Sequence, residues 1–301
     1  MTKELIDIAD LDVIYLTYDE PKREEFWIKI QNMVPWAKRV DGVKGSDAAH
    51  KSAAALSETD RFILIDGDNL PDPSFFNSQL VLDDSNRNAV FRWKAKNIIN
   101  GLQYGNGGLS CWTKEFVLNM RTHEASDGTA ANDVEFCFYP NYWAMNDCYS
   151  TTYPNQTPFQ AWRAGFREGV KMCLDRGAKP SLEEFKQRVH GRNFDHLCVW
   201  QTVGADVENG FWAILGARQG TYLTMLEDQW DYKNVQDFDA LEELWKEYES
   251  INEPVDHCKR LGEALRTRLG LPIVDMDPEE SCFFKHHYKS NFRNKGIMER
   301  E

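Results

Sequence analysis

The chain has 301 residues, of which 42% are hydrophobic and 13% aromatic, and its formal net charge is −13. This composition can supply a substantial core and excludes wholesale disorder, and the length suits one large or two modest domains. The negative charge argues against broad nonspecific binding to nucleic acid or anionic membranes, although a local basic groove is compatible with it. No apolar run approaches the roughly 20 residues that a bilayer-spanning helix needs.

The cysteines and the first residues predict the compartment. Seven cysteines are scattered without a Cys-x-x-Cys pair, which favours reduced thiols over a disulfide framework or a zinc site. Residues 1–7 are too acidic and too poor in apolar side chains for a secretory signal. We therefore expect a cytoplasmic protein without a membrane partner.

The first half of the chain alternates predicted strands and helices. Apolar runs predict strands at 12–18, 38–43 and 62–65, and helical periodicity predicts helices at 20–34 and 47–57, the latter with Ser46 as its N-cap. This order predicts an α/β fold with a mainly parallel sheet flanked by helices. Short strands are also expected at 88–93, 96–99 and 132–138, with a glycine-rich stretch over 101–108 and a helix that begins at Thr113.

The second half is expected to be mainly helical. Apolar periodicity predicts helices at 159–176, 182–190, 209–219, 238–248 and 256–268. Prolines accumulate between residues 140 and 158, which indicates a boundary there. The predicted regions are an α/β domain over 1–150, a helical region over 151–280 and a basic C-terminal tail over 281–301.

Asp66 and Asp68 are the strongest site candidates. They follow the apolar run 62–65, so they lie at the carboxyl end of a buried strand, where open α/β sheets bind ligands. Two carboxylates that flank a glycine can share Mg²⁺ or Mn²⁺, which commonly bridge to substrate phosphates. Asp-Gly is also a common turn signal, so a simple turn is the alternative.

Two further groups could complete such a site. Strand alternation puts Asp133 and Glu135 on one face, where either carboxylate could act as general base toward a hydroxyl, or both could be solvated on an exposed edge. His286 and His287 are both candidates for a third metal ligand. Basic residues around these histidines could offset the charge of a diphosphate leaving group, or the tail could simply be solvated. These basic residues are Lys285 and Lys289.

Taken together, the N-terminal half resembles glycosyltransferases of the GT-A fold. The resemblance rests on the first strand ending Leu16-Thr17-Tyr18-Asp19, the helix before the acidic strand, Asp66-Gly67-Asp68 as the Asp-x-Asp motif, Gly107-Gly108-Leu109-Ser110, and Asp133-Val134-Glu135. It implies a nucleotide-sugar donor, usually a UDP-sugar, with Mn²⁺ or Mg²⁺. By the same resemblance, Asp66 would contact the ribose or metal and Asp68 the metal. Thr17, Tyr18 and Asp19 would line the nucleoside pocket, and His287, with His286 as the alternative, would complete the metal shell.

The acceptor is predicted from a second resemblance. Residues 159–225, with Phe166-Arg167-Glu168-Gly169 and the stretch 204–210, are similar to predicted glycosyltransferases of tailed bacteriophages. This implies a hydroxymethylated pyrimidine in phage DNA as the acceptor, contacted through the basic segment 163–192, and a location in the host cytoplasm. The alternatives are a glycan or small-molecule acceptor, a nucleotidyltransferase, and a noncatalytic binding module.

Overall fold

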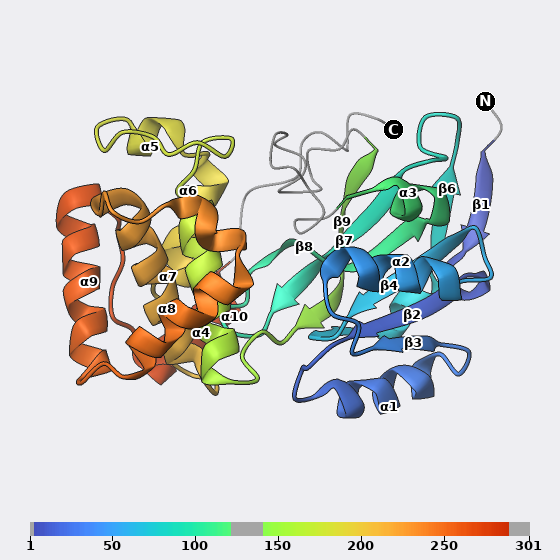
Figure 1. The fold of residues 1–301 in the computed structure, drawn as a ribbon, viewed down its shortest axis with the longest axis horizontal. Helices are drawn as coiled ribbons and strands as arrows, with labels where there is room; N and C mark the ends of the chain where they lie inside the picture. Colours follow the sequence, from blue (N-terminus) through green and yellow to red (C-terminus); the bar gives the residue numbers. More distant parts are fainter. Residues whose placement is uncertain (1–2, 122–140, 289–301) are drawn as a thin grey trace. The chain divides into compact units, whose positions relative to one another are not determined.

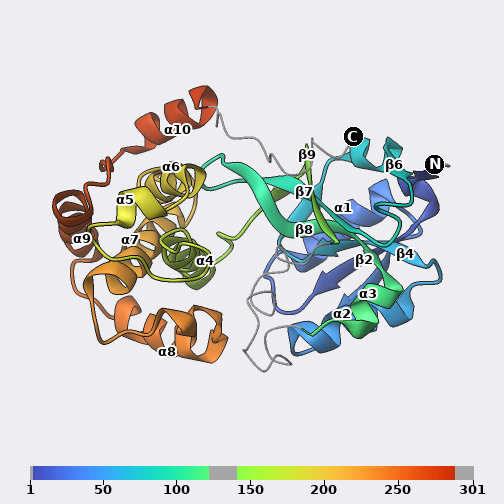
Figure 2. The same ribbon diagram turned by 90° about the horizontal axis from the view of Figure 1, so that it is seen from above.

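The computed structural model of the protein describes residues 3–121 and 141–288. Within these residues, the chain forms two compact units (Figures 1 and 2). The sheet unit comprises residues 3–97, 103–121 and 141–153, and the helical unit comprises 98–102 and 154–288. The change of unit falls between Tyr153 and Pro154, beside the boundary predicted at 150. No described helix combines the length and apolar character needed to cross a bilayer.

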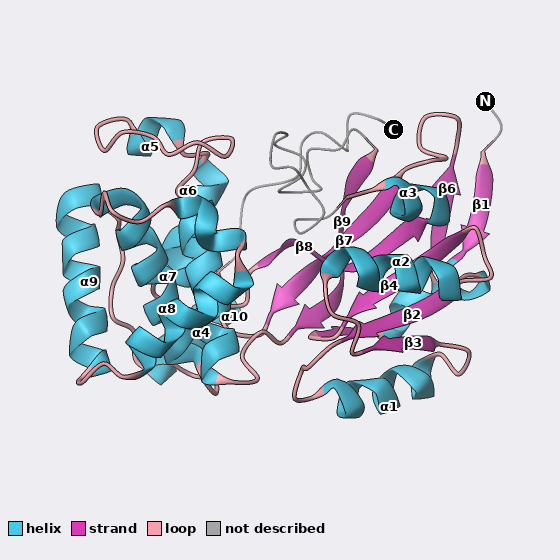
Figure 3. Cartoon of the chain, in the orientation of Figure 1, coloured by secondary structure: helices cyan, strands magenta, loops and turns pink. Residues whose placement is uncertain are grey.

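A seven-stranded sheet in the order β3-β2-β4-β8-β7-β9-β5 organises the sheet unit. Its strands are β2 (Asp12–Thr17), β3 (Lys38–Asp41), β4 (Arg61–Asp66), β5 (Asn69–Pro71), β7 (Val90–Asn97), β8 (Gln103–Thr113) and β9 (Tyr142–Thr152). Strands β2, β3, β4, β7 and β9 run in one direction, whereas β8 and β5 run in the other. A separate antiparallel pair joins β1 (Glu4–Asp7) to β6 (Gln79–Leu82). The predicted α/β class, with a helical second half, is confirmed (Figure 3).

The predicted β-α-β-α-β series is present as β2-α1-β3-α2-β4. Helix α1 (Arg23–Met33) packs Phe26 and Ile30 against one face of the sheet. Helices α2 (Ser46–Leu56) and α3 (Lys114–Asn119) cover the opposite face. Two predictions at helix starts differ. Helix α1 begins three residues late, after Pro21, and Gly45 rather than Ser46 is the N-cap of α2, with a φ of 93° that glycine tolerates. Thr113 caps α3 as predicted, because its hydroxyl accepts from the Phe116 amide.

The glycine-rich stretch is part of a strand and not a loop. Residues 103–113 form β8, and β7 is continuous over a region predicted as two short strands. Lys94 pairs with Gly105 and Arg92 with Ser110, so Trp93 alone lies opposite residues 106–109 of β8. The register of the two strands therefore shifts here. Glycine in a strand often marks such a bulge or bend. Glycines here therefore permit a bend of the sheet.

The sheet must curl strongly between β4 and β5. Only Gly67 and Asp68 connect these strands, although β8, β7 and β9 lie between them in the sheet. Four strand spacings would be about 19 Å in a flat sheet, whereas the three residue steps from Asp66 to Asn69 span at most about 11 Å. The register shifts of β7 against β8 and β9 provide the bend. As a result, the start of β5 and the end of β9 lie beside the Asp66-Gly67-Asp68 turn.

The helical unit is built from seven α-helices among the described residues. They are α4 (Pro158–Lys171), α5 (Phe185–Arg188), α6 (Gly191–Trp200), α7 (Gly210–Leu226), α8 (Phe238–Glu249), α9 (Pro254–Leu269) and α10 (Pro278–His287). Short 3₁₀ turns occur at Ile8–Asp10, Pro73–Asn77 and Tyr232–Gln236 in the chain. Helix α10 replaces the start of the predicted tail. It has a capping box between Asp277 and Glu280, a signal that sequence inspection could have recognised.

Glycines bring α4 and α7 into backbone contact. A methyl group at Gly165 or Gly169 of α4 would overlap the carbonyl of Ala213 or Ala217 in α7. Reciprocally, a methyl group at Gly216 would overlap the Trp162 carbonyl of α4. Each helix thus presents a row of small residues to the other, and large aromatic side chains such as Trp162 and Trp245 fill the space beside the row. The helical unit therefore depends on these glycines for its central packing.

Replacement of Gly165 by alanine should destabilise the helical unit. At an ordinary helix position this change is stabilising by up to about 1 kcal/mol, because alanine has the higher helix propensity. Here the added methyl group overlaps the Ala213 carbonyl, and overpacking of this kind typically costs about 1–3 kcal/mol. Urea unfolding followed by tryptophan fluorescence would measure the change. An unchanged or higher midpoint would contradict the close backbone contact.

Candidate functional site

The Asp66-Gly67-Asp68 turn is held in place from two neighbouring strands. The Tyr15 hydroxyl of β2 donates to the Gly67 carbonyl at 2.8 Å. From β9 and the residue after it, the Thr152 hydroxyl donates to Asp68 Oδ2 at 3.1 Å and the Tyr153 amide donates to the Asp68 carbonyl at 2.7 Å. These contacts fix the backbone of the turn and the Asp68 carboxylate at the carboxyl edge of β2 and β4, the edge predicted to bind ligands.

Asp66 is in an electrostatically unfavourable position for a carboxylate. Its side chain is half-buried. Burial, followed by the negative charges of Asp68 and Glu20, raises the pKa of Asp66 from its usual 3.8 to about 8. The ion pairs and hydrogen bonds of the described residues give Asp66 no cationic partner. A bound cation would remove this strain by favouring the ionised carboxylate.

Glu20 is a third acid at this turn, and the sequence reasoning missed it. Its carboxylate packs directly against Gly67, since a Cβ at residue 67 would overlap it. Glu20 Oε2 also accepts from the Tyr18 amide at 2.9 Å. The signal was available, because Glu20 lies just beyond β2, and β2 is parallel to β4 and ends at the same edge. Glu20 was instead assigned to the following helix.

The residues predicted to line a nucleoside pocket divide into two kinds. Thr17 is buried, and its hydroxyl donates to Asp41 Oδ1 at 2.6 Å and accepts from Arg39 Nε at 3.0 Å. These bonds give Thr17 a structural task that joins β2 to β3. Tyr18 and Asp19 are exposed at the same edge, next to Glu20. They are the members of the predicted pocket that a ligand can reach, and their binding role stays a prediction.

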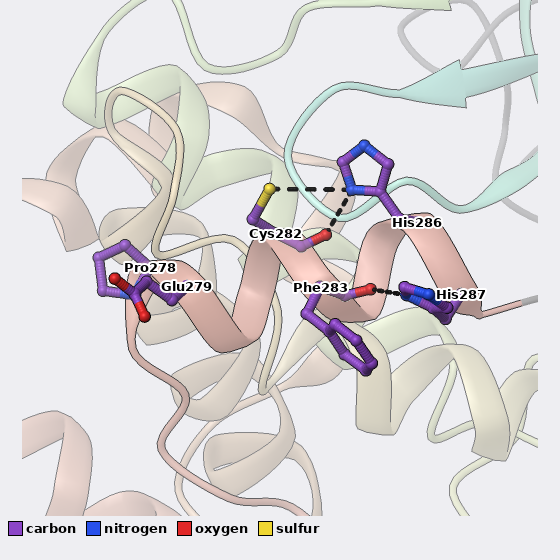
Figure 4. Close-up of a pocket in the computed structure, with 6 residues that line it drawn as sticks. All are labelled: Pro278, Glu279, Cys282, Phe283, His286 and His287. Atoms are coloured by element: carbon purple, nitrogen blue, oxygen red, sulfur yellow. Dashed lines mark hydrogen bonds between the residues drawn. The ribbon is translucent and has the colours of Figure 1, made fainter.

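Helix α10 of the helical unit carries Lys285, His286 and His287 of the predicted site. The Nδ1 atoms of His286 and His287 lie 2.7 and 2.8 Å from the carbonyls of Cys282 and Phe283 (Figure 4). Because these carbonyls accept, each Nδ1 carries a proton, and in the neutral form of each ring Nε2 has the lone pair that could bind a metal. Lys285 forms an ion pair with Asp206 at 2.5 Å.

An anionic ligand would therefore compete with Asp206 for Lys285. Three of the predicted site residues, Asp133, Glu135 and Lys289, lie outside the described residues. The roles assigned to these three, and to His286 and His287, stay predictions.

The chemistry of Asp66 and Asp68 fits a hard divalent cation. Among the described residues, no group of three or more His, Cys, Asp or Glu side chains is placed to hold a metal ion. Mg²⁺, however, is commonly held by only one or two carboxylates, and substrate phosphates and water complete its shell. The Asp66 carboxylate, which has two acidic neighbours and no cationic partner among the described residues, matches this arrangement. The donor set therefore suits a cation that arrives with a phosphorylated ligand.

Comparison with known proteins adds little to this geometry. No protein-family model matches the sequence, and no curated protein matches it. A solved glycosyltransferase involved in the glycosylation of the major capsid of PBCV-1 is 12% identical, with a TM-score of 0.30 over 47% of this chain and 94% of that one. HddC from Yersinia pseudotuberculosis is 16% identical, with a TM-score of 0.29 over 50% and 76%.

The inositol-1-phosphate CTP transferase from T. maritima is 15% identical, with a TM-score of 0.30 over 48% of this chain and 72% of that one. At these identities and TM-scores the likeness carries no functional argument. What the protein does has to be argued from its own residues.

The acidity of Asp66 should be visible in the pH dependence of stability. Folding raises the pKa of Asp66, so the folded state binds the proton more tightly than the unfolded state does. The contribution of this proton to the unfolding free energy is fully present below the usual pKa of 3.8 and is lost as the pH rises through about 8. Without divalent cation, the unfolding free energy of the wild type should therefore fall relative to Asp66→Asn between about pH 4 and pH 8. Saturating Mn²⁺ should diminish that fall, since the cation favours the carboxylate.

Denaturant titrations at a series of pH values, with and without Mn²⁺, would measure this. Asp84→Asn removes an exposed carboxylate of the same unit and serves as the control. If wild type and Asp66→Asn keep a constant difference across this range, the raised pKa is wrong.

Proposed function

We propose that this protein is a divalent-cation-dependent glycosyltransferase that uses a nucleotide-sugar, with a UDP-sugar as the expected donor. The observation that carries the proposal is the half-buried Asp66, which is held beside Asp68 and Glu20 without a cationic partner among the described residues. A nucleoside diphosphate supplies the oxygen ligands that such a two-carboxylate site lacks. The resemblance of the Asp-x-Asp motif and its preceding elements to GT-A glycosyltransferases supports the same donor.

In this proposal the residues at the edge of the sheet have three roles: binding the cation, contacting the nucleoside and holding the turn in place. Asp66 and Asp68 would hold Mn²⁺ or Mg²⁺, and the bound ion would offset the charge that develops on the diphosphate leaving group. Tyr18 and Asp19 contact the nucleoside. The Tyr15 hydroxyl and Thr152 keep the turn fixed, so the carboxylates need not reorganise during the reaction.

The acceptor hydroxyl loses its proton to a carboxylate, with Asp133 or Glu135 as the expected base. Its oxygen then forms a bond to the anomeric carbon as the bond to the diphosphate breaks. His287, with His286 as the alternative, is proposed to complete the cation's ligands, and Lys285 and Lys289 are proposed to offset charge on the diphosphate.

A hydroxymethylated pyrimidine in DNA is the acceptor that the bacteriophage resemblance favours. The structure gives other contacts to several of the basic residues that were expected to contact phosphate. Arg167 lies over the Phe238 ring with its guanidinium carbon 4.9 Å from the centroid, and Arg163 lies over the same ring at 5.1 Å. Arg188 forms an ion pair with Asp175 at 2.7 Å. A glycan or small-molecule acceptor is therefore tested beside DNA.

Asp68→Asn should reduce transfer by at least about 100-fold, because a metal ion at a leaving group contributes several kcal/mol to transition-state stabilisation. The assay offers a panel of nucleotide-sugars with Mn²⁺, and hydroxymethylated DNA, unmodified DNA and glycans as acceptors. Nucleoside diphosphate release is followed in each reaction. Asp84→Asn, with its exposed carboxylate, should keep full activity.

Undiminished turnover in Asp68→Asn would exclude the metal role of this residue. Release of pyrophosphate in place of a nucleoside diphosphate would identify a nucleotidyltransferase. Binding of a nucleotide-sugar without turnover on any acceptor would indicate a binding module.

A further inference from the structure

Arg92 lies on the same sheet face as Asp66, near the same edge. In the register of the sheet, Arg92 of β7 pairs with Ser110 of β8, and Ser110 pairs with Leu64 of β4. Paired residues share a face, so Arg92, Ser110 and Leu64 form one row, and Asp66 lies two residues further along on that face. The two strand spacings between β4 and β7 correspond to about 10 Å.

The Arg92 side chain extends toward the carboxyl edge of β7. Its Nη1 lies against Gly105, where any Cβ would overlap it, and Gly105 pairs with Lys94, two residues closer to that edge. The guanidinium carbon also lies 5.5 Å from the centroid of the Tyr142 ring. The glycine and the aromatic ring together form a cradle that orients the guanidinium, which explains why one position of the glycine-rich stretch needs no side chain.

Within the described part of the chain, Arg92 contacts an aromatic ring but has no anionic partner. Its side chain is half-buried, its Nε is buried without a hydrogen-bond acceptor, and no ion pair with a described residue involves it. Arg61, a buried arginine of the same unit, shows the contrast, since it donates to the carbonyls of Ala89 and Arg87 at 2.7 Å each. A half-buried guanidinium without an anion is costly, and a bound anion would remove that cost.

We propose that Arg92 binds the phosphate of the donor that lies farther from the nucleoside, on the sugar side of the diphosphate. A cation on Asp66 and Asp68 and a guanidinium from β7, two strands away on the same face of the sheet, can contact one diphosphate from two sides. The planar guanidinium matches two phosphate oxygens and stabilises the charge left on the departing group. This inference rests on the proposed function and deepens it.

Isothermal titration calorimetry in the presence of Mn²⁺ would test the assignment. The probe is whichever of UDP, GDP, CDP and ADP binds the wild type most tightly, and the corresponding nucleoside monophosphate is the comparison. Arg92→Met should weaken the diphosphate by at least about tenfold and leave the monophosphate within about twofold, because only the diphosphate carries the outer phosphate. Arg92→Lys, which keeps the charge but not the paired donors, should give an intermediate loss. Arg87→Met removes an arginine whose partner is the exposed Glu4, and should bind as the wild type does.

The outcomes separate the inference from the proposed function. If the wild type binds no nucleoside diphosphate in the presence of Mn²⁺, the proposed function and the Arg92 assignment are both wrong. If Asp68→Asn abolishes binding but Arg92→Met and Arg92→Lys bind like wild type, the proposed function stands and the Arg92 assignment is overturned. An equal loss of monophosphate and diphosphate would place Arg92 at the inner phosphate and would also overturn it. If Arg92→Met fails to fold by circular dichroism, Arg92→Lys carries the test.

Discussion

The position of the Asp66 carboxylate is the constraint on which the account depends. A half-buried acid beside two other acids is unfavourable in the ionised form, and the pKa of Asp66 is raised to about 8 as a result. Structures retain such groups when a ligand or a chemical role compensates them. Hydrogen bonds from Tyr15, Thr152 and the Tyr153 amide hold the turn in this geometry. In the proposed function, the turn is thus already fixed before a cation binds.

The curl of the sheet explains how this organisation is achieved. Because β7 shifts in register against β8 and β9, the sheet bends enough for only two residues to separate the end of β4 from the start of β5. The bend brings the end of β9 to Asp68, and it sets the guanidinium of Arg92 against Gly105. The helical unit is organised separately, by the glycine contacts of α4 and α7. Both units thus use glycine where backbone or charge must approach closely.

Sequence patterns predicted the features that depend on neighbouring residues. The β-α-β-α-β series and the placement of Asp66 and Asp68 after a buried strand follow from short apolar runs and turns, and these positions are as expected. Arg92 could not be found this way, because its proximity to the turn depends on which strands are paired and in what register. Glu20 follows the first predicted strand, and the expected parallel sheet already placed the end of that strand at the same edge as Asp66. The glycine-rich stretch carries no local signal of its place in β8, since only the pairing with β7 shows where the register shifts.

The central claim is that Asp66 and Asp68 hold a divalent cation, and anomalous diffraction from crystals grown with Mn²⁺ and a nucleoside diphosphate tests it most directly. The account predicts one strong manganese peak in contact with a carboxylate oxygen of Asp68, at a metal–oxygen distance of about 2.0–2.3 Å, with diphosphate oxygens in the same shell. The peak should be absent from crystals of Asp68→Asn. Density for the nucleotide without manganese at Asp66 or Asp68, or manganese bound only elsewhere, would contradict the account.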